Sequence, residues 1–562
     1  MMHKRWNIAE PDCSLRDLLS NSLGIPSVLA QILINRNIRT KEEADMFMRS
    51  DMSFLHSPLS LPDIDKAIAR IKQAIKNNEK VFLFGDYDVD GVTSCALLKL
   101  TLEKLGLQVK YCLPHRVKDG YGINKKAIDF VRKEKFDLFI SVDCGITNFK
   151  EIELLNSYGI DSIIIDHHEP QEKLPNALAV VDPKLKGHKY PFRDLAAVGV
   201  VYKVCQQLCS DSLIDDLDLV LLGTVADVVP LVGENRILVR EGLLRLAHTK
   251  KPGIAALIDV CRIKGREFDP YDVSFILGPR LNAAGRVSSA EIAFNLLTAS
   301  SASEAKDLAE QLDIENKRRR DIERGILDEA LAKVESEVNF KDHNVIVLSS
   351  EGWHQGVLGI VASRLAERFY RPTVIISTNK SLGRGSARSI RDFHIFDALS
   401  QCGELLETYG GHSHAAGLTI LESNIEKFKV LINEVAKMAL EPSDLIRSLD
   451  IDTEANLGDI SLDLISGLEK LAPFGMGNPE PTFVTYNLFL RGRPSLLGKN
   501  TLKFWVSDGR FTYPVVGFGM ADKFDFISEN RRIDLAYSAS LDSWQDSHQA
   551  QLNLKDARAS QP

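Results

Sequence analysis

The chain has 562 residues, which is too many for one ordinary domain, so we expect three or more domains. Hydrophobic residues make up 44% and charged residues 26% of the sequence, proportions that are typical of a soluble globular protein. The formal net charge of −8 excludes a basic field over the whole molecule. Any contact with nucleic acid must therefore depend on local patches of positive charge.

Cysteine usage and the lack of long apolar runs indicate the compartment. The eight cysteines are scattered and form no CxxC pair, as in a reduced cytosolic chain rather than a disulfide scaffold or a zinc ribbon. The start, MMHKRWNIAEPDC, lacks the apolar centre of a signal peptide. No uninterrupted apolar run approaches the roughly 18 residues of a membrane span. We therefore expect a cytoplasmic location and no membrane partner.

The first part of the chain, to about residue 60, is predicted to form small helices joined by loops. From about residue 67 onward, short apolar runs alternate with stretches of helical spacing. The predicted strands are 81–85, 109–114, 137–143, 162–166 and 178–183, and the helices between them are 92–106, 123–134 and 149–159. Strands that alternate with helices indicate an α/β domain with a doubly wound parallel sheet.

Residues 303–338 are predicted to form one long helix that contains a single glycine, Gly325. At ~1.5 Å per residue this helix would reach about 50 Å, which is more than one domain needs, so we interpret it as a bridge. The apolar runs NVIVLSS and PTVIIST then predict a second α/β unit, and recurring turn residues and aromatics from about Leu449 predict an all-β module. The predicted parts are a helical segment (1–60), an α/β domain (61–300), the connecting helix (301–338), a second α/β domain (339–442) and an all-β domain (443–556).

Acidic and histidine residues follow the predicted strands of the first sheet. The run VFLFG leads into GDYDVDG, DLFISVD ends in an aspartate, and SIIID leads into a histidine pair. Because the carboxyl ends of parallel strands lie along one edge of a sheet, we expect these clusters to converge. The residues concerned are Asp86, Asp88, Asp90, Asp143, Asp166, His167 and His168, and Asp227 in LLGTVADVVPLVG is a further candidate.

Carboxylates gathered in this way repel one another at neutral pH, and a divalent metal resolves the conflict. Aspartate oxygens suit Mg²⁺ and Mn²⁺, and histidine favours Mn²⁺. Two ions bridged by a carboxylate can hydrolyse a phosphate ester. An isolated DxDxD pattern is often only a solvated loop, and a histidine pair often only hydrogen-bonds locally. The joint pattern favours a metal site, because each cluster ends its own apolar strand.

The motifs GDYDVDG, SVDCGIT, IDHHEP and GTVADVVPL resemble successive motifs of the DHH phosphoesterase superfamily. The motifs GPRLNAAGR, GGHSHAAG and PFGMGNPEPTF narrow the resemblance to the RecJ family of bacterial exonucleases specific for single-stranded DNA, over about residues 50 to 550. The resemblance implies a DHH domain, a DHHA1 domain and a C-terminal OB-fold. It also implies 5′-to-3′ hydrolysis of single-stranded DNA to mononucleotides with Mn²⁺ or Mg²⁺, in DNA repair and recombination.

The resemblance also implies roles for particular residues. The metal ligands would be Asp88, Asp90, Asp143, His167 and Asp227. Asp86 would ligate a metal or orient a ligand, and His168 would lie beside the scissile phosphate and stabilise its charge or transfer a proton.

Contacts to the nucleic acid follow from the same resemblance. The loop SLGRGSARS (381–389) would cradle a phosphate, because its glycines let backbone amides approach and its serines and arginines donate hydrogen bonds. Arg280 would hold the 5′ phosphate. The full set of predicted contacts is Arg116, Tyr121, Arg280, Asn282, Ser386, Arg388, Ser389 and His412. Tyr121 could instead be a loop-packing aromatic, and the charge run NKRRR (316–320) is as consistent with a solvated helix face as with a strand contact.

Two alternatives stay open. A DHH phosphoesterase of short oligonucleotides or cyclic dinucleotides is less consistent with the C-terminal β-rich region. A non-catalytic replication scaffold is expected to lack metal ligands that are all present in this chain. As partners the resemblance implies single-stranded DNA, a single-strand-binding protein and a helicase, and we expect a monomer.

Overall fold

The computed structural model describes residues 4–116, 118–209, 212–542 and 549–560. The chain forms two compact units. The large unit consists of His56–Val229 and Glu241–Ile446, and the barrel unit consists of Met1–Leu55, Pro230–Arg240 and Arg447–Pro562.

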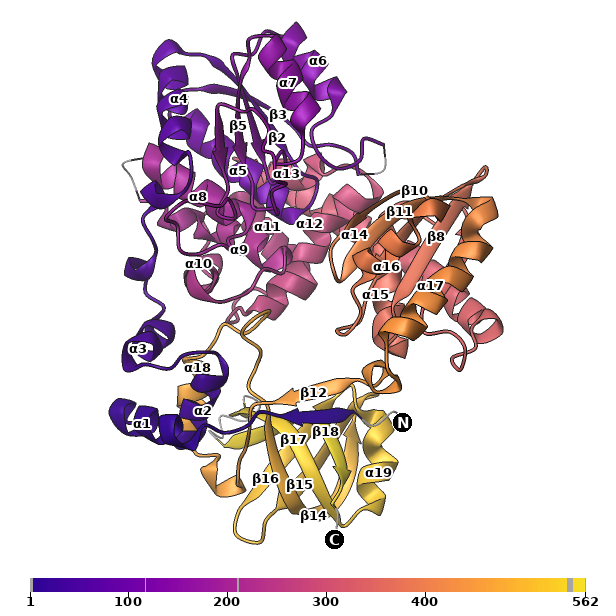
Figure 1. Cartoon of the computed structure of the whole chain (residues 1–562). Coiled ribbons are helices and arrows are strands. Elements are labelled where there is room, and N and C mark those ends of the chain that lie inside the picture. The colour runs from indigo at the N-terminus through magenta and orange to yellow at the C-terminus, as the bar shows by residue number, and fades with distance from the viewer. Residues whose placement is uncertain (1–3, 117, 210–211, 543–548, 561–562) are drawn as a thin grey trace. The chain divides into compact units, whose positions relative to one another are not determined.

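The large unit begins with the predicted parallel sheet, whose strand order is β3-β2-β4-β5-β6. The strands are β2 (Lys80–Gly85), β3 (Gln108–Cys112), β4 (Leu138–Val142), β5 (Asp161–Ile165) and β6 (Ala179–Val181). Helices α6 (Lys125–Lys133) and α7 (Phe149–Ser157) pack on one face, where Ile128 and Ile152 join the phenylalanines of β2 and β4 in one core. Helix α5 (Val89–Lys104) packs against the sheet, α8 (Ala197–Leu208) and α9 (Leu217–Ala226). The doubly wound α/β architecture is therefore confirmed (Figure 1).

A helical region follows the sheet. Its elements are α10 (Gly233–Leu246), α11 (Pro252–Cys261), the π-helix η4 (Asp272–Leu277), α12 (Gly278–Val287) and α13 (Glu291–Thr298). The predicted long helix is α14 (Ala302–Glu337), which is capped by the Ser301 side chain and extends over about 54 Å at ~1.5 Å per residue. It packs on α11, α12 and α13 near its start and on α15 (Leu358–Phe369) and β7 (Ile346–Glu351) near its end. The helix thus joins the two α/β parts of the large unit.

The second sheet has the order β10-β11-β9-β8-β7, in which only β7 and β8 are parallel. Its other strands are β8 (Thr373–Asn379), β9 (Leu382–Arg388), β10 (Leu406–Gly411) and β11 (Ala415–Leu421), and its further helices are α16 (Ile395–Gln401) and α17 (Ile425–Ala439). The prediction of a phosphate-cradling loop in SLGRGSARS is wrong, because this stretch is the central strand β9. Its backbone pairs with β8 and β11, and Gly383 and Gly385 lie where a Cβ would press on Ile376.

The barrel unit contains the predicted all-β domain. Its strand order is β13-β14-β15-β16-β18-β17, and pairing of β14 with β17 closes the barrel, as expected for an OB-fold. The strands are β13 (Thr453–Glu454), β14 (Phe483–Leu497), β15 (Thr501–Ser507), β16 (Thr512–Phe518), β17 (Arg532–Leu541) and β18 (Ala550–Ala559). Helix α19 (Phe524–Glu529) lies between β16 and β17, and Phe483, Phe504 and Tyr537 fill the core.

The N-terminal segment is only partly as predicted. It contains α1 (Cys13–Leu23), α2 (Ser27–Asn35) and α3 (Lys41–Arg49), but it begins with strand β1 (Arg5–Ile8), which pairs in parallel with β12 (Ser448–Ile451). The helices pack on the barrel core together with α18 (Leu462–Glu469). Local sequence patterns do not predict a four-residue strand whose partner lies more than 400 residues away along the chain.

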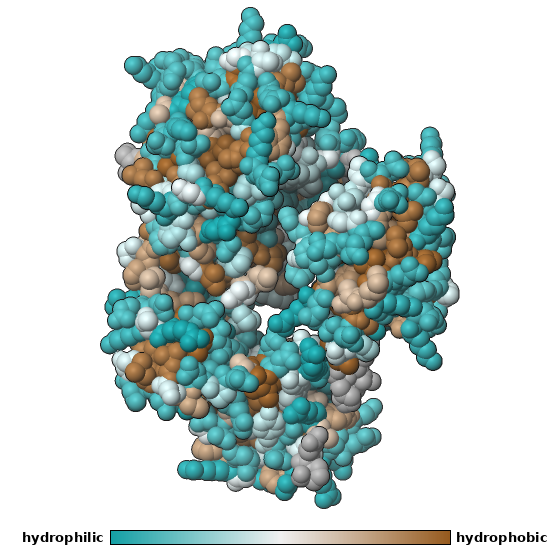
Figure 2. Space-filling model, in the orientation of Figure 1, coloured by the Kyte–Doolittle hydropathy of each residue, from teal (hydrophilic) through white to brown (hydrophobic). Residues whose placement is uncertain are grey.

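In the described part of the chain, no single helix has the length and apolar character to cross a membrane. Helices α1 and α2 meet that criterion only as a pair, and the chain bends by 117° between them. The eight cysteines, all of which lie in the described part of the chain, form no disulfide. The visible face of the molecule is largely hydrophilic, with apolar residues in separate patches (Figure 2).

Candidate active site

The first acidic cluster lies in the turn between β2 and α5. Asp88 caps α5, because its carboxylate accepts the N–H of Gly91 at 3.1 Å. A Cβ on Gly91 would come within 2.7 Å of the Asp86 backbone, so only glycine lets the helix start this close to the strand end. Asp86 is buried, and burial together with the charge of Asp88 raises its pKa well above the usual value.

Asp90 ties the first turn of α5 to the N-terminus of α8. Its carboxylate accepts the N–H groups of Ala197 at 2.7 Å and Val198 at 2.9 Å. Burial and the charge of Asp88 raise the pKa of Asp90 to about 7. Gly223 in α9 leaves room for this carboxylate, since a Cβ there would lie 2.8 Å from Asp90 Oδ1.

Asp143 follows β4 in a left-handed backbone conformation, with φ of 59°. Such a conformation costs a non-glycine residue roughly 1–3 kcal/mol and is characteristic of functional sites. The Asp143 N–H donates to the carbonyl of Ile165 at 3.0 Å, which holds the residue beside the end of β5. Burial and the charge of Asp88 raise the pKa of Asp143 well above the usual value.

His167 presents one nitrogen to three carboxylates. Its Nδ1 lies 3.2 Å from the carbonyl of Leu195, which can only accept, so Nδ1 carries the proton. Its Nε2 lies 3.2 Å from Asp143 Oδ1, 3.7 Å from Asp227 Oδ2 and 3.9 Å from Asp90 Oδ2. Burial and the charge of His168 lower the pKa of His167 to about 3, so the ring is neutral. This is the arrangement of a metal-ligating histidine, whose other nitrogen donates to a carbonyl.

The donor set fits divalent cations. Asp86 Oδ1 and His167 Nε2 are buried and have no hydrogen-bond partner among the described residues. Three groups bring their ligand atoms within 4.8 Å of one another: Asp90, His167 and Asp227; Asp86, Asp88 and Asp143; and Asp143, His167 and His168. The first two groups share no residue, and the third takes one member from each, so the ligand atoms at this edge of the sheet have room for two adjacent ions. The structure thus brings together every predicted member of the metal centre.

Asp166 was expected among the converging residues, but the sequence assigned it no role. Its buried carboxylate accepts the N–H groups of Ile146, His167 and His168 at 3.0, 2.8 and 3.2 Å, and it lies 2.7 Å from His168 Nδ1. Burial favours a higher pKa for Asp166, but the hydrogen bond and charge of His168 outweigh it and hold the pKa below the usual value. The signal was present in the sequence, because this aspartate directly precedes the histidine pair.

His168 is the second histidine of the motif and has the opposite charge state. Burial favours a lower pKa for His168, but Asp166 outweighs it and raises the pKa to about 9. The ring is therefore an imidazolium at neutral pH, with Nδ1 bound to Asp166 and Nε2 available to donate to a substrate. Tyr121, which is half-exposed, places its hydroxyl 3.3 Å from His168 Nδ1. The structure therefore brings Tyr121 to the site.

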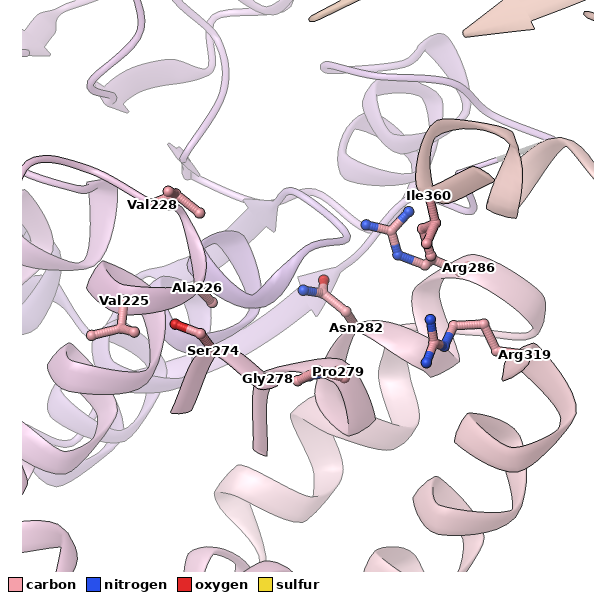
Figure 3. A pocket seen from close by; sticks show the side chains of 10 residues that line it. All are labelled: Val225, Ala226, Val228, Ser274, Gly278, Pro279, Asn282, Arg286, Arg319 and Ile360. Carbon is pink, nitrogen blue, oxygen red and sulfur yellow. The ribbon is translucent and has the colours of Figure 1, made fainter. Parts of the chain in front are cut away.

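A cavity of about 200 Å³ lies where α12, α14 and α15 meet the end of α9. Asn282, Arg286 and Arg319 lie on one side of it, and Val225, Ala226 and Val228 lie on the other (Figure 3). The remaining lining residues are Ser274, Gly278, Pro279 and Ile360. The predicted substrate contact Asn282 is thus at this cavity, together with Arg319 from the NKRRR run, whose role the sequence left open, and Arg286, which was not predicted as a site residue.

Arg286 lies in a cluster of positive charge. Burial lowers its pKa to about 9, and the charges of Arg116, Arg319 and Arg388 act in the same direction. The nearby charge of Asp88 acts in the opposite direction, so the arginine cluster borders the acidic one. Gly356 makes room at this point, because a Cβ there would lie 2.1 Å from the carbonyl of Arg286.

Two predicted contacts belong to this arginine cluster. The guanidinium of Arg116 lies 4.8 Å from the ring centre of Tyr87, the residue between Asp86 and Asp88. Arg388 Nη1 donates to Ser386 Oγ at 3.1 Å, so these side chains of β9 act as a pair. The cluster of Arg116, Arg286, Arg319 and Arg388 is called the arginine cluster below.

Arg280 lies on a different face of α12. Its Nε donates to Asp313 Oδ1 at 3.0 Å and its Nη1 to the carbonyl of Ile276 at 2.8 Å. It does not line the cavity, because residues two positions apart in a helix do not face the same side. Asn282 and Arg286 are four positions apart and do share a face. The structure therefore puts Arg286, and not Arg280, at the cavity.

Ser389 and His412 are less closely connected to the site. Ser389 Oγ donates to the carbonyl of Phe393 at 2.6 Å, which uses its hydroxyl proton within the turn. His412 is exposed in the turn between β10 and β11, where its N–H donates to the carbonyl of Ala415 at 2.8 Å. Neither is among the described residues that line the cavity.

Three family models match the chain in sequence order. The DHH family, N-terminal domain, matches residues 80–224, the DHHA1 domain matches residues 342–438, and the RecJ OB domain matches residues 451–556. These ranges coincide with the parallel sheet, the second sheet and the barrel.

Proteins of known activity are similar over nearly the whole chain. The single-stranded-DNA-specific exonuclease RecJ of Bacillus subtilis (strain 168) is 37% identical over 560 residues, which are 99% of this chain and 71% of the relative. Crystal structures of RecJ from Thermus thermophilus in complex with Mn²⁺ and with Mg²⁺ match with TM-scores of 0.85 and 0.79 and identities of 28% and 26%. Both matches cover 99% of this chain, and they cover 80% and 79% of the solved chains. With this identity and coverage, the chain belongs to the RecJ family of single-stranded-DNA-specific exonucleases.

Proposed function

We propose that the chain is a metal-dependent exonuclease that hydrolyses single-stranded DNA from the 5′ end to mononucleotides, in DNA repair and recombination. The observation that carries the proposal is that two clusters of opposite charge lie near one another. An acidic cluster with a neutral histidine borders a cluster of arginines at one edge of the parallel sheet. The first suits metal ions and the second suits phosphate. The direction of digestion rests on the family resemblance.

Two ions, Mn²⁺ or Mg²⁺, are the cofactors that suit this donor set. One would be held by Asp90, His167 and Asp227, and the other by Asp86, Asp88 and Asp143. When bound, such ions lower the pKa of a water and stabilise negative charge on phosphate oxygens. Burial, together with repulsion among the carboxylates, raises the pKa of Asp86 and Asp143, which supports a need for cations here.

The protein's own groups complete the chemistry. His168, protonated and held by Asp166, is suited to donate from Nε2 to an oxygen of the scissile phosphate. Tyr121 lies beside it and is suited to contact the adjoining nucleotide. We therefore propose His168 and Asp86 as the catalytic residues, Asp86 through the metal that it would hold, and Asp166 as the residue that orients His168.

The arginine cluster is proposed to hold the terminal phosphate. Guanidinium groups bind phosphate by charge-assisted, bidentate hydrogen bonds, and a terminal phosphate carries more charge than an internal one. Arg116, Arg286, Arg388 and the Ser386 hydroxyl are suited to this role, and Asn282 is suited to a neighbouring phosphate or sugar. Such a pocket makes an enzyme begin at a chain end. Contacts by Arg280, Ser389 and His412 stay predictions.

The barrel is proposed to bind the single strand. On β15, Leu502, Phe504 and Val506 point inward, so Lys503 and Trp505 lie on the outer face. Trp505 pairs across the sheet with Arg491 on β14 and with Pro514 on β16. Exposed aromatics among cations on these strands are how OB-folds stack and track single strands.

The finer assignments rest on the family resemblance alone. We propose that the enzyme is a monomer that works with a single-strand-binding protein and a helicase in the bacterial cytoplasm. Cysteines that form no disulfide fit a reducing compartment. We also propose that the sequence divides into residues 61–300, 301–338, 339–442 and 443–556, with 1–60 as an N-terminal segment whose helices pack on the barrel core.

The test uses a single-stranded oligonucleotide labelled at either end, with Mn²⁺ and with chelator. Immediate release of a 5′-labelled mononucleotide, followed by a shrinking 3′-labelled ladder, is expected with metal only. Strand binding without digestion would instead indicate a scaffold. Digestion restricted to very short oligomers would indicate a small-substrate phosphoesterase.

A further inference from the structure

The long helix α14 carries a buried carboxylate that has no role in the site described above. Of the acidic residues of α14, which the structure describes in full, Glu323 alone is buried. Its side chain is 1% exposed. A carboxylate in such a place is costly unless it is paired, so its partners indicate what it does.

Glu323 binds two arginines from two helices. Its Oε2 accepts a hydrogen bond from Arg319 Nη1 at 2.8 Å, and its Oε1 lies 2.6 Å from Nε of Arg364 on α15. The Arg319 and Glu323 side chains are 11% and 2% exposed, whereas those of Lys306 and Glu310, a pair with the same spacing on α14, are 74% and 55% exposed. An exposed pair adds little to stability, but a buried pair fixes both partners in one geometry.

Asn316 holds the same guanidinium from the other direction along the helix. Its Oδ1 accepts from Arg319 Nε at 3.3 Å and from Nη2 at 3.1 Å. Asn316 is 1% exposed, and its Nδ2 has no hydrogen-bond partner among the described residues. Within the described part of the chain, the Asn316 amide group therefore serves Arg319.

The held guanidinium belongs to the cavity. An arginine has five N–H donors, and these contacts use three of them, which leaves one on Nη1 and one on Nη2. Arg319 lines the cavity, but neither Asn316 nor Glu323 is among its lining residues. The Arg319 side chain extends from α14 toward the side on which Asn282 lies (Figure 3). The two partners thus hold Arg319 without filling the space in front of it.

A held arginine binds an anion better than a mobile one. A free arginine side chain has many rotamers and loses this freedom when it binds, so holding it in advance removes part of that cost. Burial and the charges of Arg320 and Arg364 lower the pKa of Arg319, and the charge of Glu323 acts in the opposite direction. Glu323 therefore also helps to keep the buried guanidinium protonated.

We propose that Glu323, together with Asn316, is a positioning residue that holds Arg319 ready to bind the terminal phosphate of the strand. This inference rests on the proposed function of the arginine cluster and deepens it. It assigns to a carboxylate outside the cavity an effect on how strongly a 5′-phosphorylated end is preferred.

The test compares binding of a short oligonucleotide with a 5′ phosphate and with a 5′ hydroxyl. Both forms carry a dye at the 3′ end, and fluorescence anisotropy with the full chain in EDTA gives the ratio of the two dissociation constants. We expect Arg319→Ala to lower this preference about tenfold, as for one charge-assisted hydrogen bond, and Glu323→Gln to lower it about fivefold. Asn316→Ala should act in the same direction.

A double variant separates positioning from a purely structural role. Adding Glu323→Gln to Arg319→Ala should lower the preference no further than Arg319→Ala alone, because Glu323 acts through Arg319. A further loss in the double variant would overturn the inference. So would an unchanged preference in Glu323→Gln, or an unaltered chain that does not prefer the phosphorylated form.

Two matched variants serve as controls. Glu335→Gln changes an exposed glutamate of the same helix, and Arg364→Ala removes the other partner of Glu323. Both should keep the preference of the unaltered chain. If Arg364→Ala lowered it as much as Glu323→Gln, Glu323 would act by joining α14 to α15, and the inference would fail. Digestion with Mn²⁺ is measured separately, so a chain that prefers phosphorylated ends without digesting them would refute the proposed exonuclease and not this inference.

Discussion

At the scale of single residues, the two adjacent histidines differ in what their Nδ1 atoms meet. The partner of His167 Nδ1 is a carbonyl, which leaves a neutral ring with a lone pair on Nε2. The partner of His168 Nδ1 is the Asp166 carboxylate, which keeps that ring protonated. Neutral nitrogen suits a metal and imidazolium suits phosphate, so one motif serves two chemical roles.

Asp143 lies in the group that links the two proposed ion sites. We expect Asp143→Ala to abolish digestion of single-stranded DNA with Mn²⁺ and to leave strand binding largely intact, since most affinity comes from phosphate contacts elsewhere. Digestion and anisotropy of the same oligonucleotide measure the two effects. Retained turnover would contradict the assignment of Asp143 as a ligand.

Arg286 and Arg280 form a matched pair on α12, one at the cavity and one in an ion pair with Asp313. Arg286→Ala should reduce the preference for 5′-phosphorylated over unphosphorylated ends by about tenfold, which corresponds to one charge-assisted hydrogen bond of about 1.5 kcal/mol. Arg280→Ala is the control and should keep the ratio of the two digestion rates. If Arg280→Ala lowers this ratio and Arg286→Ala does not, then Arg280, and not Arg286, holds the terminal phosphate.

At the scale of elements, the same residue types have different uses in the two sheets. The glycines of β9 let a central strand pack closely against the side chains of Ile376 and Leu418. Strand β9 can therefore bind a phosphate through the side chains of Ser386 and Arg388, and not through the backbone amides of a loop. In the barrel, alternation along β15 separates the core residues from an outward row that includes Lys503 and Trp505.

Trp505 is the exposed aromatic at the centre of that outward row. Trp505→Ala should weaken binding of a long single strand on the order of tenfold, within the ~1–3 kcal/mol that one stacked base contributes. Leu462→Ala on α18 is the control, because it removes an exposed apolar side chain of the barrel unit away from these strands. Equal strand affinities of the two variants would argue against β15 as the binding face.

At the scale of the whole molecule, local sequence patterns correctly predicted the helices and strands that depend on local contacts. The parallel sheet and the convergence of its acidic ends followed from apolar runs that stop at aspartates. The pairing of β1 with β12 and the place of Pro230–Arg240 in the barrel unit depend on partners hundreds of residues away, so no local pattern reveals them. Which of Arg280 and Arg286 faces the cavity depends on the rotation of α12 about its own axis, and a sequence motif alone does not determine that rotation.

The shared core of the barrel unit leads to a last prediction. The predicted boundary at residue 443 cuts away α2, although Leu29, Ile32 and Leu33 are fully buried in the same core as Phe504 and Tyr537. A Cβ on Gly467 would lie 2.5 Å from Leu29 Cδ2, so α18 packs directly on α2. Asn35 and Arg36 add contacts to Asp452 of 2.7 and 3.1 Å.

A fragment of residues 443–556 should therefore not fold cooperatively by itself. The burial of each of these core side chains contributes about 1.5–3 kcal/mol to stability. Exposing them to water therefore removes much of the ~5–15 kcal/mol by which a folded domain is stable. Circular dichroism during urea titration measures this, with the full chain as reference. Adding a peptide of residues 1–55 should restore a cooperative transition, because it supplies α1, α2, α3 and β1. A steep transition of the fragment alone, unaffected by the peptide, would mean that the barrel's own strands supply enough core.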